Sequence, residues 1–261
     1  KLAVCAASCG PGNTHLIQGL YDAHRNGAKV LALASHIPSR QIGSKFFQET
    51  HPEAIFQECS GYCEMVNSAE QGGVVLHHAI QSSMAGNGVS VLVIPGDVSM
   101  QDAEDDSFVE SKISAGRPVV FPDPAEAAAL TQAINEANSV TLFVGAGVKD
   151  AREQVLKLAE KIKAPIGHAL GGKMYIQYEN PFDVGMNGLL GYGAAHEATH
   201  EADLLILLGT DFPYNDFLPD ANVAQVDING SHIGRRTKIS YPVTGDVAAT
   251  IENILPHVDE K

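Results

Sequence analysis

Glycine-rich turns that follow apolar runs are the first feature of this sequence that could support chemistry. Gly10-Pro11-Gly12-Asn13 precedes a helical pattern, so its amides lie where a helix N-terminus can bind an anion or a polar cofactor. Gly145-Ala146-Gly147 stands in the same order, but Asp150 occupies the position at which a third glycine would complete the dinucleotide fingerprint. Each turn therefore allows two interpretations, a ligand-binding loop or a plain turn between a strand and a helix.

The second half of the chain is dense in such turns, and each follows a run that resembles a strand. They are Gly171-Gly172-Lys173, the segment from Gly185 to Gly191, Gly209-Thr210-Asp211 and Gly245-Asp246. Open α/β sheets bind ligands at the carboxyl ends of their strands, where glycine lets the backbone approach a long ligand. Asp227, directly after the run Val223–Val226, is placed to accept hydrogen bonds from ribose hydroxyls. Together these turns favour a dinucleotide site.

Two further groups of residues carry reactive side chains. Phe47-Gln48-Glu49-Thr50-His51 lies in a loop-rich stretch and fits either the wall of a substrate pocket or a surface loop with a buried ring. The four cysteines form two pairs, Cys5 with Cys9 and Cys59 with Cys63, at a spacing that differs from that of zinc sites. We therefore expect reduced structural thiols and no metal site.

The elements that must position these residues alternate between strands and helices. Continuous apolar runs predict buried parallel strands, and apolar residues at helical spacing predict the helices between them. We expect strands over residues 2–7, 30–34, 89–94, 140–144, 165–168, 204–208 and 223–228, and helices over residues 14–24, 71–84, 124–138, 151–162 and 247–254. This alternation predicts an α/β fold with two doubly wound parallel-sheet units, the second of them Rossmann-like.

A change of composition separates the two units. Residues 101–124 are rich in acidic residues and turn formers and show no periodicity, which is typical of a linker. We place the two domains at residues 1–115, linker included, and 116–261. The first unit opens on a strand of the buried type and has only three expected strands, so we expect its N-terminal part to be missing.

Composition excludes several classes of function. The 261-residue chain has a net charge of −14, and a negative field of this size repels nucleic acid. No apolar stretch approaches the roughly 20 residues that span a bilayer. Arg235-Arg236-Thr237-Lys238 is too short a basic run for a membrane-binding patch. We expect a cytoplasmic protein.

Many of these segments, in order, resemble the thiamine-diphosphate enzymes, and most of all the pyruvate:quinone oxidoreductase (pyruvate oxidase) family. The first half resembles the pyrimidine-binding domain through Ala6–Asn13, Ala34–Ser39, Phe47–Pro52 and Ile94–Val98. The second half resembles the central FAD-binding domain through Ala164–Leu170, Asp183–Met186, Leu208–Tyr214 and Gln225–Asn229. The likeness covers essentially the whole chain.

The resemblance implies a three-domain subunit in a homotetramer, with FAD, thiamine diphosphate and magnesium as cofactors. It implies that Phe47 and Gln48 lie beside the thiamine and the substrate. The FAD contacts that it implies are Asn187, Gly188, Leu189, Leu190, Thr210, Asp211, Phe212, Pro213, Tyr214 and Asp227. In that family pyruvate is oxidatively decarboxylated to acetate, and FAD passes the electrons to a quinone, on the inner face of the cell membrane.

The sequence departs from the family pattern in three places. The glutamate that activates thiamine would lie before residue 1, the glycine-rich magnesium–diphosphate signature is absent, and so is the C-terminal membrane-binding segment. We therefore expect a fragment that is inactive alone. Two alternatives stay open, an acetohydroxyacid synthase-like thiamine enzyme, and a non-catalytic module that binds NAD or FAD.

Overall fold

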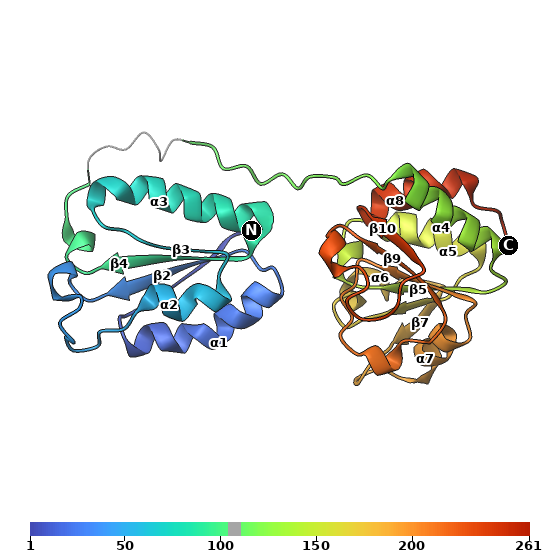
Figure 1. Cartoon of the computed structure of the whole chain (residues 1–261), viewed down its shortest axis with the longest axis horizontal. Helices are drawn as coiled ribbons and strands as arrows, with labels where there is room; N and C mark the ends of the chain where they lie inside the picture. Colours follow the sequence, from blue (N-terminus) through green and yellow to red (C-terminus); the bar gives the residue numbers. More distant parts are fainter. Residues whose placement is uncertain (104–110) are drawn as a thin grey trace. The chain divides into compact units, whose positions relative to one another are not determined.

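The computed structural model describes residues 1–103 and 111–261, and the chain divides into two compact units, Lys1–Arg117 and Pro118–Lys261 (Figure 1). The sequence placed this boundary between residues 115 and 116. Part of the predicted linker, residues 104–110, lies outside the described residues. Each unit has a sheet of its own.

The first unit contains a four-stranded parallel sheet in the order β1-β2-β4-β3. Its strands are β1 (Ala3–Ala7), β2 (Val30–His36), β3 (Tyr62–Met65) and β4 (Val89–Pro95), and its helices are α1 (Pro11–Arg25), α2 (Pro52–Phe56) and α3 (Ala69–Ser82).

Helices cover both faces of this sheet because side chains alternate between the faces along each strand. On one face Leu20 of α1 and Phe56 of α2 pack against Ala32. On the other face Val75 and Ala79 of α3 join a separate apolar cluster. Figure 1 shows α3 on one side of the sheet and α1 and α2 on the other. The unit is doubly wound.

Two expectations for this unit were wrong. The strand at residues 2–7 was expected to be buried, yet β1 lies at the sheet edge, where Val4 is 61% exposed. The sheet has four strands, whereas three were expected, because β3 was not predicted. Tyr62-Cys63-Glu64-Met65 is short and includes a charged residue, so it lacks the apolar run on which the prediction depended.

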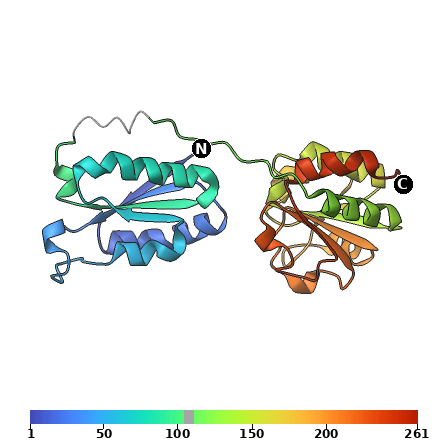
Figure 2. The ribbon, with the colours of Figure 1, turned by 45° about the horizontal axis from the view of Figure 1, so that its top comes forward.

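The second unit contains a six-stranded parallel sheet in the order β10-β9-β8-β5-β6-β7. Its strands are β5 (Val140–Val144), β6 (Ile166–His168), β7 (Asp183–Met186), β8 (Leu204–Leu208), β9 (Asn222–Asp227) and β10 (Tyr241–Thr244). Its helices are α4 (Pro124–Glu136), α5 (Arg152–Ile162), α6 (Lys173–Ile176), α7 (Gly193–His200) and α8 (Val247–Ile254). Figure 2 shows the two units from a second direction.

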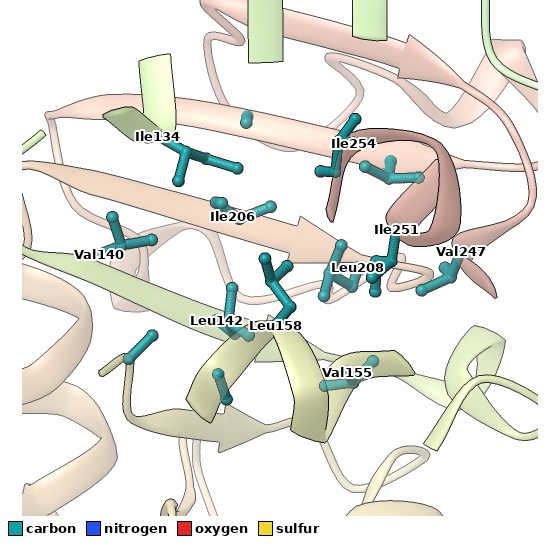
Figure 3. Close-up of a cluster of buried hydrophobic side chains, with 14 of the residues drawn as sticks. Ile134, Val140, Leu142, Val155, Leu158, Ile206, Leu208, Val247, Ile251 and Ile254 are labelled. Carbon is teal, nitrogen blue, oxygen red and sulfur yellow. The ribbon is translucent and has the colours of Figure 1, made fainter. Parts of the chain in front are cut away.

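The core of the second unit lies mainly on one face of the sheet. Leu142 of β5 and Ile206 of β8 pack there with Leu158 of α5 and Ile251 of α8, as Figure 3 shows. The opposite face carries Phe143, Leu205 and Leu207. α7 covers part of it, and Thr141 donates a 2.6 Å hydrogen bond to its Ala198 carbonyl.

The strand order places a topological switch between β5 and β8, because the chain runs from β5 outward to β7 and then returns to β8. Ligands of doubly wound sheets bind at the carboxyl ends of the strands beside such a switch. The predicted fold class, α/β with two parallel-sheet units, is confirmed. In the described part of the chain, no helix is long and apolar enough to cross a membrane.

Candidate functional site

The loops after β5 and β8 meet at the switch point, and glycine makes this contact possible. A Cβ on Gly147 would lie 2.6 Å from Gly209 Cα, and a Cβ on Gly145 would lie 2.5 Å from Thr210 Cβ. Gly147 N also donates a 2.9 Å hydrogen bond to Gly209 O. These glycines therefore have a packing role of their own, whether or not a ligand approaches them.

The two predicted flavin-binding loops, residues 187–190 and 210–214, contact each other. Gly188 has a φ of +106°, and a Cβ there would lie 3.1 Å from ring atoms of Phe212 and Tyr214. Buried Asn187 fixes the first loop, since its Oδ1 accepts from Gly188 N at 2.9 Å and its Nδ2 donates to Phe217 O at 3.0 Å. The structure thus brings together two segments that the sequence predicted only separately.

Burial divides the predicted flavin contacts into two groups. Thr210 and Phe212 are buried, and Phe212 packs edge-on against Phe143 with ring centroids 5.0 Å apart. Phe212 is therefore also a core residue. The exposed members are Leu189, Leu190, Asp211, Pro213 and Tyr214. These side chains are the ones that a ligand could reach.

Asp227 ends β9 at the same edge of the sheet and is largely buried. Its Oδ1 accepts from Asn229 N at 2.8 Å and lies 3.5 Å from His232 Nδ1. The backbone amide and the imidazole therefore hold the carboxylate in place at the carboxyl end of its strand. A carboxylate held in this way suits the recognition of ligand hydroxyl groups.

Asp211 forms an ion-pair cluster with two arginines that the prediction did not include in the site. Arg235 Nη1 lies 3.1 Å from Asp211 Oδ2, and Arg236 Nε lies 3.0 Å from Oδ1. Partial burial raises the pKa of Asp211, but the hydrogen bond from Arg236 and the charges of Arg236 and Arg235 outweigh it, so the net pKa is lowered.

From the sequence, Arg235 and Arg236 were weighed only as part of a membrane-binding patch, for which the basic run is too short, and His232 was given no role. Two features of the sequence point to these residues. They lie on the segment that follows Asp227, and the two arginines stand together in a strongly acidic chain. Arginine is well suited to phosphate recognition because its planar guanidinium donates two parallel hydrogen bonds.

The chemistry of this edge fits a dinucleotide such as FAD. Guanidinium groups could bind its diphosphate, the carboxylate of Asp227 could bind ribose hydroxyls, and exposed Leu189 and Leu190 offer apolar surface to a ring system. Two hollows of this unit lie away from this edge. One of about 540 Å³ runs along α4, and another of about 350 Å³ lies at the amino ends of β8 to β10.

In the first unit the structure brings Gln48 against the turn after β1. Cys9 Sγ donates to Gln48 Oε1 at 3.4 Å, and a Cβ on Gly10 would lie 2.8 Å from Gln48 Cβ. Both Gly10 and Gln48 have a φ of +64°. The left-handed conformation is costly for glutamine, so the surrounding contacts must hold it. Phe47 beside it is 78% exposed.

Three buried polar atoms lie at or near this edge of the first sheet without a hydrogen-bond partner among the described residues. They are Asn13 Oδ1, His36 Nδ1 and Thr50 Oγ1. Burial lowers the pKa of His36, whereas Glu49 and Glu53 act in the opposite direction. Unpaired buried atoms are costly, so this cluster suits a polar ligand or an ordered water.

Neighbouring loops are fixed by carboxylates. Ser39 donates to Asp97 through its amide and its hydroxyl, and Glu49 accepts from the amides of Gly43 and Phe46. Hydrogen bonds to the ionised form lower the pKa of both acids. In the described part of the chain, no group of three or more His, Cys, Asp or Glu side chains could hold a metal ion.

Both units match families of known proteins. Residues 127–254 match the family described as "Thiamine pyrophosphate enzyme, central domain". Residues 1–55 match "Thiamine pyrophosphate enzyme, N-terminal TPP binding domain". The second match includes Gly10 and the Phe47–Gln48 loop, and the first includes every predicted flavin contact.

Individual relatives extend over nearly the whole chain. The "Uncharacterized 42.6 kDa protein in isoamylase 3'region" of Pseudomonas amyloderamosa is 49% identical over 98% of this chain and 65% of its own length. An acetolactate synthase of Mycobacterium leprae is 30% identical over 98% of this chain and 42% of its own length. A pyruvate oxidase of Lactiplantibacillus plantarum is 28% identical over 100% and 44%. The chain thus spans between 42% and 65% of the length of these relatives.

Proposed function

Since this chain belongs to the thiamine pyrophosphate enzymes, we propose that it forms the pyrimidine-binding and FAD-binding parts of a pyruvate oxidase that reduces a quinone. The reaction would convert pyruvate, water and quinone into acetate, carbon dioxide and quinol. Similarity to a pyruvate oxidase over the entire chain supports this proposal. Membrane quinone, a homotetrameric assembly and a site of action at the inner face of the cell membrane belong to the same proposal.

Within this reaction, bound thiamine diphosphate would supply the nucleophilic carbon that decarboxylates the 2-keto acid, and bound FAD would supply the two-electron acceptor. The residues of this chain would orient these groups and exclude water. Gln48 and Phe47 would line the substrate side of the thiamine site. Asp227 would accept from ribose hydroxyls, and Arg236 would bind the flavin diphosphate.

The observation that carries the proposal is the grouping of Asp227, His232, Asp211, Arg235 and Arg236 at the carboxyl edge of β8 and β9. This edge lies next to the switch point, where doubly wound sheets bind nucleotides. The charges alternate over a short distance, as a ligand with both hydroxyl and phosphate groups requires.

A flavin titration of the 261-residue chain tests this site. We expect FAD fluorescence to be quenched on binding. Asp227→Asn should weaken binding by about one to two decades, because a hydrogen bond to a charged group is worth about 1.5–3 kcal/mol. The amide oxygen of asparagine can still accept from Asn229 N, so the local fold is kept.

Asp203→Asn is the matched control, since Asp203 accepts from Asn138 N and Ser139 N at the opposite, amino edge of the sheet. It should leave the FAD affinity unchanged. Equal affinity of all three proteins would place the flavin elsewhere. Gly188→Val is a poor probe, because its φ of +106° and the nearby rings of Phe212 and Tyr214 make the substitution a test of folding.

An acetolactate synthase-type enzyme is the second candidate, and the 30% identical relative from Mycobacterium leprae favours it. The two candidates differ in the use of the flavin. The test uses a protein that contains this chain and is as long as the relatives. With thiamine diphosphate and magnesium, and in the absence of oxygen, added pyruvate should bleach its flavin and yield acetate. Acetolactate formed with an oxidised flavin would show the second activity. Binding of NAD in place of FAD would favour a non-catalytic module.

A further inference from the structure

Helix α7 carries a pair of histidines that the proposed function does not use. His196-Glu197-Ala198-Thr199-His200 has the H-E-x-x-H spacing, which places residues i and i+4 on one face of a helix. The two imidazole rings are in contact, with centroids 4.0 Å apart and planes inclined at 39°. His196 is half-buried and His200 is exposed, so solvent reaches the pair.

The hydrogen bonds of His200 leave one of its ring nitrogens available to a cation. His200 Nδ1 lies 2.9 Å from the carbonyl oxygen of His196. A carbonyl only accepts, so this contact places the proton on Nδ1 and the lone pair on Nε2. Histidines that ligate metals use the same arrangement, in which the second ring nitrogen donates to a backbone carbonyl.

The surroundings of His196 hold its ring in place but leave one ring nitrogen without a hydrogen bond. Phe217 packs edge-on against the ring, with centroids 6.1 Å apart. His196 Nδ1 is buried and has no hydrogen-bond partner among the residues that the structure describes. A ring that is fixed in place loses little conformational entropy when it binds a ligand. The pair is therefore preorganised on the side of His196 and accessible on the side of His200.

From this geometry we infer that His196 and His200 form a two-histidine site for a divalent transition metal, with water completing the coordination. Imidazole is a ligand for zinc, copper, iron and nickel. The net charge of −14 favours the approach of cations. The site differs from that of a zinc protease, which has a third protein ligand, because the described residues offer no group of three ligating side chains.

Isothermal titration of the 261-residue chain with Ni²⁺ alone tests the site. A pH of 7.5 is suitable because a ligating imidazole must be unprotonated. Nickel is preferable to zinc because thiolates select zinc, and the chain has four cysteines. We expect one site per chain, and His196→Gln or His200→Gln should each weaken it by about tenfold or more. The double variant should abolish it.

His78→Gln is the matched control, because His77 and His78 are adjacent on α3 and do not face the same way, although their rings lie 6.0 Å apart. It should bind Ni²⁺ like the wild type. A second measurement needs no variant: paramagnetic Ni²⁺ should broaden the ring signals of His196 and His200 before those of any other histidine. Unchanged affinity in the two single variants, or broadening that starts elsewhere, would overturn the inference. Both results are independent of flavin binding.

Discussion

At the scale of single residues, several predicted ligand contacts also build the loops in which they stand. Gly188 is needed for a left-handed turn beside two aromatic rings, and Phe212 belongs to the core through Phe143. Substitution at these positions would disturb the fold before it revealed anything about ligand binding. Asp227 and Arg236 are better probes, because their side chains end in charged groups at the edge of the sheet.

His168 is a residue whose environment predicts a dependence of stability on pH. Its side chain is fully buried, and Nε2 lies 3.5 Å from Asp183 Oδ1. Burial lowers its pKa, although the Ala169 carbonyl and Asp183 act in the opposite direction. The unfolded chain therefore binds the proton first as the pH falls, and the stabilisation is lost as the pH decreases through about 6.5, the value in unfolded chains.

We therefore expect the free energy of unfolding to fall between pH 7.5 and pH 5.5, with His168 contributing up to about 1.4 kcal/mol of the loss. His168→Gln removes the titrating group. It should lower the stability at pH 7.5, and its difference from the wild type should narrow at pH 5.5. Urea denaturation at the two pH values measures this. A difference that stays constant would show that His168 does not titrate in this range.

At the scale of single elements, the C-terminal end of α5 is stabilised by hydrogen bonds, but the lysine that caps it has a strained backbone conformation. Lys163 caps the helix in the left-handed conformation, with a φ of +52°, and its amide bonds to Ala159 O. The next amide, of Ala164, bonds to the same carbonyl at 3.0 Å. Helices usually end in this way with glycine, because a side chain makes the conformation costly.

Lys163→Gly should therefore stabilise the protein by about 0.5–1 kcal/mol, since relief of the strain exceeds the entropy that glycine adds to the unfolded chain. Lys157→Gly supplies the control. Lys157 is exposed in the interior of the same helix, where glycine should destabilise by about 1 kcal/mol. Thermal denaturation would show opposite shifts of Tm. A shift in the same direction for both would contradict the capping argument.

At the scale of the whole molecule, each of the two units buries a core against a parallel sheet, and the chain remains strongly acidic. Several large apolar side chains nevertheless stay exposed in the segments that follow the neighbouring strands β6 and β7. They are Leu170, Met174, Tyr178, Leu189, Leu190 and Tyr192. Exposed apolar groups of this kind are typical of surfaces that bind a partner. They support the proposal that the protein is a homo-oligomer.

We expect the purified chain to self-associate, and the association to strengthen with salt, because screening weakens the repulsion between copies of charge −14. Met174→Glu and Leu170→Glu, at exposed side chains outside the predicted flavin contacts, should shift sedimentation profiles toward the monomer. Met100→Glu, at an exposed methionine of the other unit, adds the same charge and should have a smaller effect. A monomer at all concentrations and salt levels would refute self-association.

Elements with strong local patterns could be predicted from the sequence. Two apolar runs predicted β5 and β8, and helical spacing predicted α8. All three elements have the bounds that were expected. The sequence also predicted that glycine-rich loops would follow these strands. Such features depend on neighbours a few residues apart, so one chain segment contains the information.

Tertiary packing sets the strand order, the short strands β3, β7 and β10, and the contacts between loops. The sequence did not show that Gly188 meets Phe212, that Gln48 lies against Gly10, or that Arg236 binds Asp211. These residues are far apart along the chain, and the crossover connections bring them together at one edge of each sheet. The physical reason is that such contacts depend on how whole elements pack, and this packing leaves no periodic pattern in the residues that meet.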